Sequence, residues 1–159
     1  MPRILGNMAA ALLAIRYGFR GPSHSVSTAC STGLHSIGDA YNFIKNNMAD
    51  VMIAGGTDAC INPLAISGFS NIRALSKKFK DDPTKASRPF DKDRDGFVMS
   101  EGAALLVLEE LEHAIGRNAN IVCEVVGKRM NNEISCRFYF RLKFVHDLIQ
   151  FKNIKKIRV

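Results

Sequence analysis

The sequence has no run of about eighteen apolar residues, which a membrane-spanning helix would require. Its first residues do not follow the charged, apolar and small-residue order of a secretory signal. It contains no internal repeat and no low-complexity tract. We therefore expect a protein without a membrane span, located inside the cell.

Cysteine is scarce, since the 159 residues include only Cys30, Cys60, Cys123 and Cys136. They form no CxxC pair and have no histidines at zinc-ligand spacing, so we expect no metal site. Four cysteines could form two disulfides, but their spacing and the long apolar strands favour a reducing, intracellular compartment. We expect Cys60 and Cys123 to be core side chains.

The segment 91–96 begins like a calcium-binding loop, with aspartates at alternate positions. The twelfth position of an EF-hand loop carries a bidentate glutamate, whereas here it is Gly102, with Glu101 one place early. A proline-containing loop and a strand flank the segment, where an EF-hand has two helices. We therefore predict that this segment binds no calcium.

Charge divides the chain near Gly127. Residues 1–127 hold thirteen basic and thirteen acidic side chains, whereas residues 128–159 hold nine basic and two acidic ones. We predict one domain at 1–127 and a basic tail at 128–159. Such a tail could bind nucleic acid or anionic lipid. Because that hypothesis rests on the tail alone, we expect no nucleic-acid partner for the protein as a whole.

The hydrophobic pattern predicts alternating helices and strands. Helices are expected at 7–17, 31–45, 62–69 and 111–116, and strands at 25–29, 51–54, 103–108 and 121–126. A polar loop is expected over 76–95. This alternation is typical of an α/β protein whose sheet is covered on both faces.

Cys30 lies between the strand expected at 25–29 and the helix expected from residue 31. Unpaired N–H groups and the positive end of the helix dipole favour the thiolate there. The same N–H groups can stabilise an oxyanion formed when the sulfur attacks a carbonyl. This arrangement resembles the nucleophile elbow of hydrolases. The alternative is an inert core cysteine, but the small and polar neighbours of Cys30 leave room for a substrate.

His35 follows Cys30 by five residues. Five residues of helix turn by about 500°, which leaves the two side chains roughly 140° apart. We therefore expect His35 to be a buried, hydrogen-bonded helix residue and not a partner of the thiol.

Five motifs resemble, in the same order, the nucleophile half of β-ketoacyl-acyl-carrier-protein synthases of the type II elongating kind. They are GPS at 21–23 with STACSTGLH at 27–35, ADVMIAGGTD at 49–58, GF at 68–69 with RALS at 73–76, RPFD at 88–91 with RDGFV at 94–98, and EGAA at 101–104 with LEE at 108–110 and HA at 113–114. One motif alone would be weak, but five in order are specific. The resemblance implies a partial thiolase-like layered fold, with a mixed sheet and helices on both faces.

The resemblance also implies a reaction, the decarboxylative Claisen condensation of fatty-acid elongation. Cys30 would take an acyl group, as a thioester, from the phosphopantetheine arm of an acyl carrier protein. The carbanion formed from malonyl-carrier would then attack that thioester. No cofactor is implied beyond the phosphopantetheine of the carrier, and the complete enzyme is expected to be a homodimer.

Two further site residues follow from the resemblance. Phe69 matches a position that lines the acyl pocket, and its alternative is plain core packing. Arg73 matches a basic position that meets the acidic carrier protein, and its alternative is a solvated surface arginine.

The resemblance ends near residue 127 and covers less than half of a typical synthase. The two histidines and the lysine that support decarboxylation in the family match no segment of these 159 residues. We therefore expect a fragment or a truncated gene model, inactive alone, in the mitochondrion or the cytoplasm. The alternative is a non-catalytic ketosynthase-like protein that binds a partner or the carrier.

Overall fold

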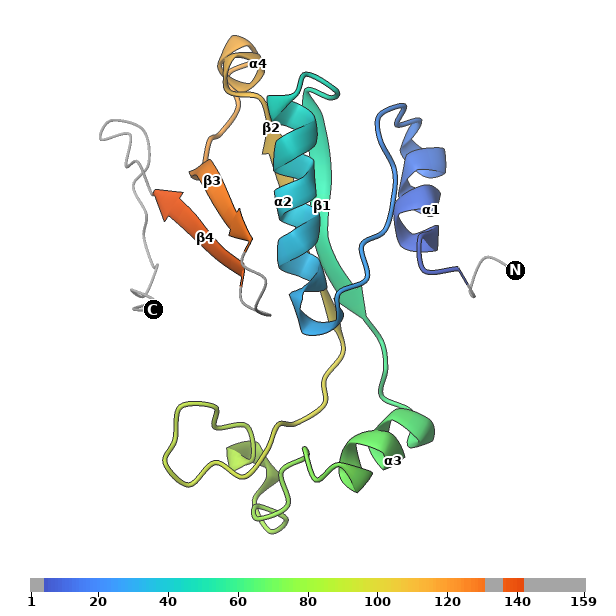
Figure 1. Cartoon of the computed structure of the whole chain (residues 1–159), viewed down its shortest axis with the longest axis vertical. Helices are drawn as coiled ribbons and strands as arrows, with labels where there is room; N and C mark the ends of the chain where they lie inside the picture. Colours follow the sequence, from blue (N-terminus) through green and yellow to red (C-terminus); the bar gives the residue numbers. More distant parts are fainter. Residues whose placement is uncertain (1–4, 131–135, 142–159) are drawn as a thin grey trace. The chain divides into compact units, whose positions relative to one another are not determined.

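A computed structural model describes residues 5–130 and 136–141 of the chain (Figure 1). In chain order its elements are α1 (Met8–Tyr17), a 3-10 turn (Ala29–Ser31), α2 (Thr32–Lys45), β1 (Val51–Asp58), α3 (Pro63–Asn71), a 3-10 turn (Pro83–Lys85), β2 (Gly102–Glu109), α4 (Leu111–Gly116), β3 (Glu124–Met130) and β4 (Cys136–Arg141). The chain forms two compact units. Unit one combines the residues up to Ala54 with those from Val107 onward, and unit two is Gly55–Leu106.

The core of unit one is built on α2. Ile37 and Ala40 are one helical turn apart, so they lie on the same face of the helix. They pack against Ala54 of β1 and Leu108 of β2, and all four side chains are buried. Figure 1 shows α2 running along β1, with β3 and β4 near it, and Val125 of β3 packs against the same cluster.

The strands β1 and β2 form a two-stranded sheet. The Glu110 backbone N–H donates to the Asp50 carbonyl (2.9 Å) in unit one, while Gly55 approaches Ala104 in unit two. Because the residue number rises along one strand as it falls along the other, the two strands are antiparallel.

Alternate residues of β1 point to opposite faces of this sheet. Ala54 is buried and Met52 half-buried beside α2, whereas Val51 and Ile53 are 43% and 39% exposed. Val107 of β2 is 66% exposed. Within the described part of unit one, α2 therefore covers one face of the sheet and the other face remains open and apolar.

The strands β3 and β4 form a second antiparallel pair, with Glu124 opposite Arg141 and Met130 opposite Cys136. The strand predicted at 121–126 begins three residues later and continues through the predicted domain boundary at residue 127. The second strand, β4, lies in the segment predicted as a basic tail. The boundary itself stays a prediction, and residues 142–159 of the tail lie outside the described part of the chain.

In unit two, α3 begins at a clear N-terminal signal. The Asn62 side chain accepts a hydrogen bond from the Ala65 N–H (3.0 Å), and Pro63 occupies the first helical position. Beyond α3, the Asp95 carboxylate accepts hydrogen bonds from the Ser76 hydroxyl and from the N–H groups of Lys77 and Lys78. These bonds close the polar loop predicted over 76–95.

The prediction of a strand at 25–29 was wrong. The described chain has no strand there and instead turns into the 3-10 segment Ala29–Ser31. Residues with strand propensity become a strand only when a neighbouring strand satisfies their backbone groups. Among the described residues, none pairs with this segment.

Among residues 5–130 and 136–141, no helix has the length and the apolar character needed to cross a bilayer.

Candidate functional site

Cys30 sits in the 3-10 turn that leads directly into α2, and its side chain is exposed. The predicted elbow therefore consists of an irregular segment, a tight turn and a helix. The N-terminal residue of α2 is preceded by Ser31, whose side chain makes no capping bond to the helix. At the start of α2 the Thr32 N–H donates to the Ala29 carbonyl, so the backbone of the turn continues into the helix next to the thiol.

The backbone just before the thiol is unusual. Ala29 has a φ of 51°, in the left-handed region that residues with a Cβ rarely adopt. The Thr32 hydroxyl accepts from the Thr28 N–H (3.0 Å) and donates to the Ala29 carbonyl (2.7 Å). The Ser31 N–H donates to the Thr28 carbonyl (3.1 Å). The turn that presents Cys30 is thus closed by bonds on both sides of Ala29.

His35 takes part in the same network. Its Nδ1 atom lies 2.7 Å from the Thr28 hydroxyl oxygen, and its side chain is half-buried. The expectation of a hydrogen-bonded helix residue is confirmed, although the burial is only partial. The sequence did not predict Thr28 as the partner of His35, because this hydrogen bond depends on the left-handed turn at Ala29.

Phe69 lies on α3 in unit two and is 38% exposed. Its ring meets that of Phe97 edge-on, with the centroids 5.1 Å apart. Phe97 in turn lines an open, mainly apolar cavity of about 370 Å³ within the same unit. Phe69 is not itself among the residues lining that cavity, and its predicted role beside an acyl chain stays a prediction.

Arg73 is exposed and follows the C-terminus of α3. The Arg73 N–H donates to the Ser70 carbonyl and the Ala74 N–H to the Phe69 carbonyl, each at 3.0 Å. This is the Schellman pattern of helix termination, in which the residue at Arg73 must be left-handed, and its φ is 56°. α3 therefore carries Phe69 and fixes the backbone of Arg73, whereas Cys30 belongs to unit one.

The other helices end with residues better suited to this conformation. Gly18, Asn47 and Asn118 take positive φ after α1, α2 and α4, and glycine and asparagine are the residues that tolerate it best. Arginine at residue 73 is therefore less suited to the left-handed backbone than glycine or asparagine.

The other two described thiols lie outside the elbow. Cys60 is half-buried, and burial together with the neighbouring Asp58 carboxylate raises the pKa of its thiol. Cys123 is exposed. The expectation of a core position is therefore wrong for Cys123, because the segment before β3 lies on the surface. The side chain of Cys136 lies outside the described residues.

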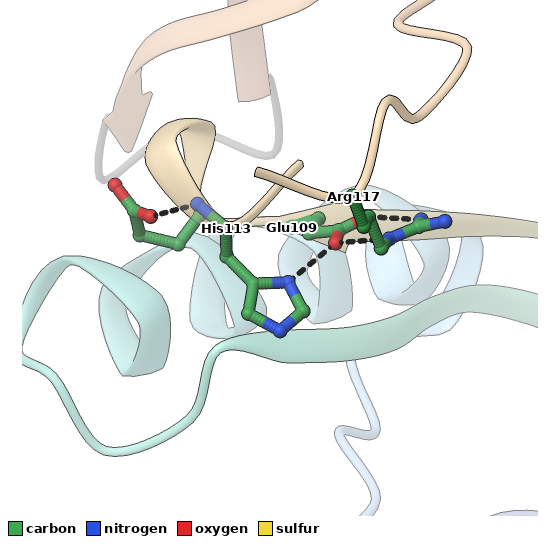
Figure 2. A network of polar contacts seen from close by, with 4 residues as sticks. Glu109, His113 and Arg117 are labelled. Atoms are coloured by element: carbon green, nitrogen blue, oxygen red, sulfur yellow. Dashed lines mark hydrogen bonds and ion pairs between the residues drawn. The ribbon is translucent and has the colours of Figure 1, made fainter. Parts of the chain in front are cut away.

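A charged cluster at the junction of β2 and α4 was not predicted. Figure 2 shows His113 and Arg117 converging on the Glu109 carboxylate, with Arg117 Nε at 2.7 Å and His113 Nδ1 at 2.5 Å from Oε1. Arg117, helped by His113, lowers the pKa of Glu109 from 4.5 to about 2. Helical spacing gave no signal for this cluster, because Glu109 ends β2 and Arg117 follows α4. The cluster ties the end of β2 to α4.

No group of three potential metal ligands occurs in the described part of the chain. In the calcium-like segment, the Asp91 carboxylate accepts from the Asp93 N–H (2.8 Å) and the Asp95 carboxylate from residues 76–78. Both carboxylates thus bond to the protein's own donors.

The chain resembles known proteins over most of its described length. Residues 1–114 match the family described as "Beta-ketoacyl synthase, N-terminal domain". A relative from Schizosaccharomyces pombe, "Putative 3-oxoacyl-[acyl-carrier-protein] synthase, mitochondrial", is 60% identical over 125 residues, which are 79% of this chain and 29% of that protein. The mitochondrial 3-oxoacyl-[acyl-carrier-protein] synthase of Arabidopsis thaliana is 53% identical over 84% of this chain and 29% of its own length.

Solved structures agree with these relatives. A β-ketoacyl synthase from Burkholderia phymatum has a TM-score of 0.74 at 38% identity, over 80% of this chain and 31% of that one. A type II polyketide ketosynthase, solved in complex with its acyl-carrier protein, has a TM-score of 0.76 at 38% identity, over 79% and 31% of the two chains. These matches confirm the predicted α/β class and a partial thiolase-like fold. The chain spans about a third of the length of the proteins it matches, and it belongs to the β-ketoacyl synthase family, in the N-terminal domain.

Proposed function

We propose that the chain supplies the nucleophile half of a β-ketoacyl-acyl-carrier-protein synthase, with Cys30 as the residue that is acylated. The observation that carries this proposal is the exposed position of Cys30 at the entrance to α2, inside the segment that matches the family. The names of the relatives support the substrate class, because they are 3-oxoacyl-[acyl-carrier-protein] synthases.

The acyl-transfer step needs a thiolate and a stabilised oxyanion. The Cys30 sulfur attacks the thioester carbonyl of the acyl-carrier, forming a new C–S bond and a tetrahedral oxyanion. The bond to the phosphopantetheine sulfur then breaks, and the carrier leaves as a thiolate that takes a proton from solvent. In this proposal the positive end of the α2 dipole, next to Cys30, stabilises the charge on both the attacking sulfur and the oxyanion.

The partner in this step is an acyl carrier protein, and the chain needs no cofactor beyond the carrier's phosphopantetheine. The solved complex of a related ketosynthase with its acyl-carrier protein supports this choice. Arg73 supplies a positive charge for an acidic carrier, and Phe69 an apolar wall for the acyl chain. A homodimer in the complete enzyme is part of the same proposal.

Acylation of Cys30 is the direct test. The chain is incubated with an acylated carrier protein, and the mass of each cysteine peptide is then measured. We expect a thioester on the Cys30 peptide, lost in Cys30→Ala and kept in Cys123→Ala, which removes an exposed thiol elsewhere in unit one. Carrier binding without any adduct would favour the alternative, a non-catalytic carrier-binding protein.

Condensation is a separate step, with a separate expected outcome. The family resemblance assigns decarboxylation to two histidines and a lysine that match no segment of these 159 residues. We therefore predict that residues 1–159 alone form the acyl-enzyme but release no β-ketoacyl product from malonyl-carrier. Product in a chromatographic assay of the purified chain would contradict this prediction.

We also propose a location inside the cell, in the mitochondrion or the cytoplasm. The names of the relatives from Schizosaccharomyces pombe and Arabidopsis thaliana, which place those proteins in mitochondria, support the first choice. Fractionation of cells that produce the native protein distinguishes the two compartments, and recovery from the culture medium would exclude both.

A further inference from the structure

The backbone at Ala29 requires an explanation that the sequence does not offer. Four described residues other than glycine have positive φ, and three of them close helices at their C-termini. Ala29 is the exception, since it precedes the thiol and opens a turn. A left-handed residue with a Cβ costs roughly 1–2 kcal/mol, so neighbouring contacts must hold it in place.

The contacts that hold Ala29 form a chain of hydrogen bonds that ends at His35. Thr32 bonds to the backbone on both sides of the turn, at the Thr28 N–H and the Ala29 carbonyl. The Thr28 side chain is held in turn by His35 Nδ1, at 2.7 Å. His35 is anchored in the second turn of α2, two residues before the buried Ile37.

We infer that His35 is a positioning residue for Cys30, acting through Thr28. This inference rests on the proposed function, in which Cys30 is the nucleophile. His35 fixes the Thr28 side chain, Thr28 and Thr32 fix the left-handed turn at Ala29, and the turn keeps the Cys30 sulfur exposed above the start of α2. No contact between the imidazole and the sulfur is required, in keeping with the angle of roughly 140° that five helical residues impose.

The hydrogen bond involves one nitrogen of the ring, which makes the inference testable by substitution. The side-chain amide of asparagine can place a polar atom near the position of Nδ1, whereas leucine fills a similar volume without any polar atom. His35→Asn should therefore retain the link to Thr28, and His35→Leu should break it. Thr28→Val removes the hydroxyl from the other side of the same bond.

The readout is the alkylation rate of Cys30 divided by that of Cys123 in the same sample of the full chain. Cys123 is exposed and lies outside the network, so it corrects for general changes in stability. Loss of one hydrogen bond should lower this ratio about threefold to tenfold in His35→Leu and in Thr28→Val. The double variant should fall no further than the lower single variant, and His35→Asn should stay near the wild-type ratio from pH 6 to 9.

A second readout concerns the backbone. Amide exchange at Thr28, whose N–H bonds to Thr32, should become faster in His35→Leu and stay slow in His35→Asn. Faster exchange with an unchanged alkylation ratio would make His35 a purely structural residue and overturn the inference. Equal falls in the asparagine and leucine variants, or additive falls in the double variant, would also overturn it.

A different result would contradict the proposed function. If Cys30 of the wild-type chain reacts no faster than Cys123, the assignment of the nucleophile is wrong, and the positioning role falls with it. If wild-type Cys30 reacts faster and His35→Leu leaves the ratio unchanged, the inference alone is wrong.

Discussion

Arg73 takes a left-handed backbone conformation that glycine adopts without strain. Replacing it with glycine removes roughly 1 kcal/mol of strain but adds flexibility to the unfolded chain, so the free energy of unfolding should stay within about 1 kcal/mol of wild type. Binding to an acidic carrier protein should weaken, because the positive charge is lost. Denaturant titration and a binding isotherm at low salt measure the two effects.

The matched control for Arg73 is Asn118→Gly, which makes the same backbone exchange after α4. This variant should leave carrier binding unchanged, and Arg73→Lys should retain most of it. Unchanged binding in Arg73→Gly would leave Arg73 as an ordinary surface residue.

Cys60 should be the slowest of the three described thiols to react. Burial, followed by the Asp58 carboxylate, raises the pKa of its thiol, so less thiolate is present at neutral pH. Asp58→Asn should lower this pKa and speed the alkylation of Cys60, without restoring the rate of a fully exposed thiol. Peptide mapping after brief alkylation at pH 8 measures the rate, with Cys123 as the internal reference. Slower labelling of Cys60 in the variant would contradict the assigned effect of Asp58.

At the scale of an element, Gly55 sets how closely β1 and β2 approach. A Cβ atom at this position would lie 2.1 Å from the Ala104 carbonyl oxygen, so the strands would have to separate. Gly55→Ala should therefore destabilise the protein by about 1–3 kcal/mol. Gly102→Ala is the matched control on β2, because a Cβ there meets nothing within 4 Å. Thermal unfolding followed by circular dichroism compares the two, and equal midpoints would show that the sheet adapts.

The helices were the most predictable elements. The predicted helix at 111–116 coincides with α4, and α2 and α3 begin within one residue of the predicted positions, because periodicity and the Asn62–Pro63 start signal are local properties. The strand β1 runs four residues beyond its predicted end, since Gly55 and Gly56 indicated a turn but here allow close strand pairing.

Features that depend on distant partners were harder to predict. The segment 25–29 has the composition of a strand without a pairing partner in the described chain, and β4 was hidden in a segment that its charge marked as a tail. Cys30 was found through its motif, whereas its link to His35 was not. That link spans seven residues between Thr28 and His35, and it requires the left-handed turn at Ala29.

At the scale of the whole molecule, lowering the pH should destabilise both units over the same pH range. Glu109 in unit one and Asp95 in unit two each have a pKa lowered to about 2, chiefly by the hydrogen bonds from Arg117 and Ser76, respectively. In the unfolded chain both carboxyls regain their ordinary values, so the unfolded state binds more protons between about pH 4.5 and pH 2. Stability should therefore be fully present above about pH 4.5 and decrease as the pH falls toward 2.

Denaturant titrations at several pH values between about 2 and 4.5 measure how steeply the free energy of unfolding decreases with falling pH, and this dependence is the slope compared below. Glu109→Gln and Asp95→Asn should each flatten it, because one titrating carboxylate is removed. Asp93→Asn, which removes an exposed carboxylate two residues from Asp95, is the control and should change the slope less. A slope as steep in Glu109→Gln as in wild type would contradict the role given to that cluster.

The division of unit one into two stretches of sequence has a consequence for the order of events on the ribosome. Ile37 and Ala54 pack against Leu108, which is synthesised about 70 residues after Ile37. At about 5–20 residues per second, the apolar face of α2 waits roughly 4–14 s for that partner. Unit two is continuous in sequence and is complete before Leu108 is added. During this interval α2 is a natural target for chaperones that bind nascent chains, whereas the hydrogen bonds of the elbow join residues 28–35 and need no part of β2.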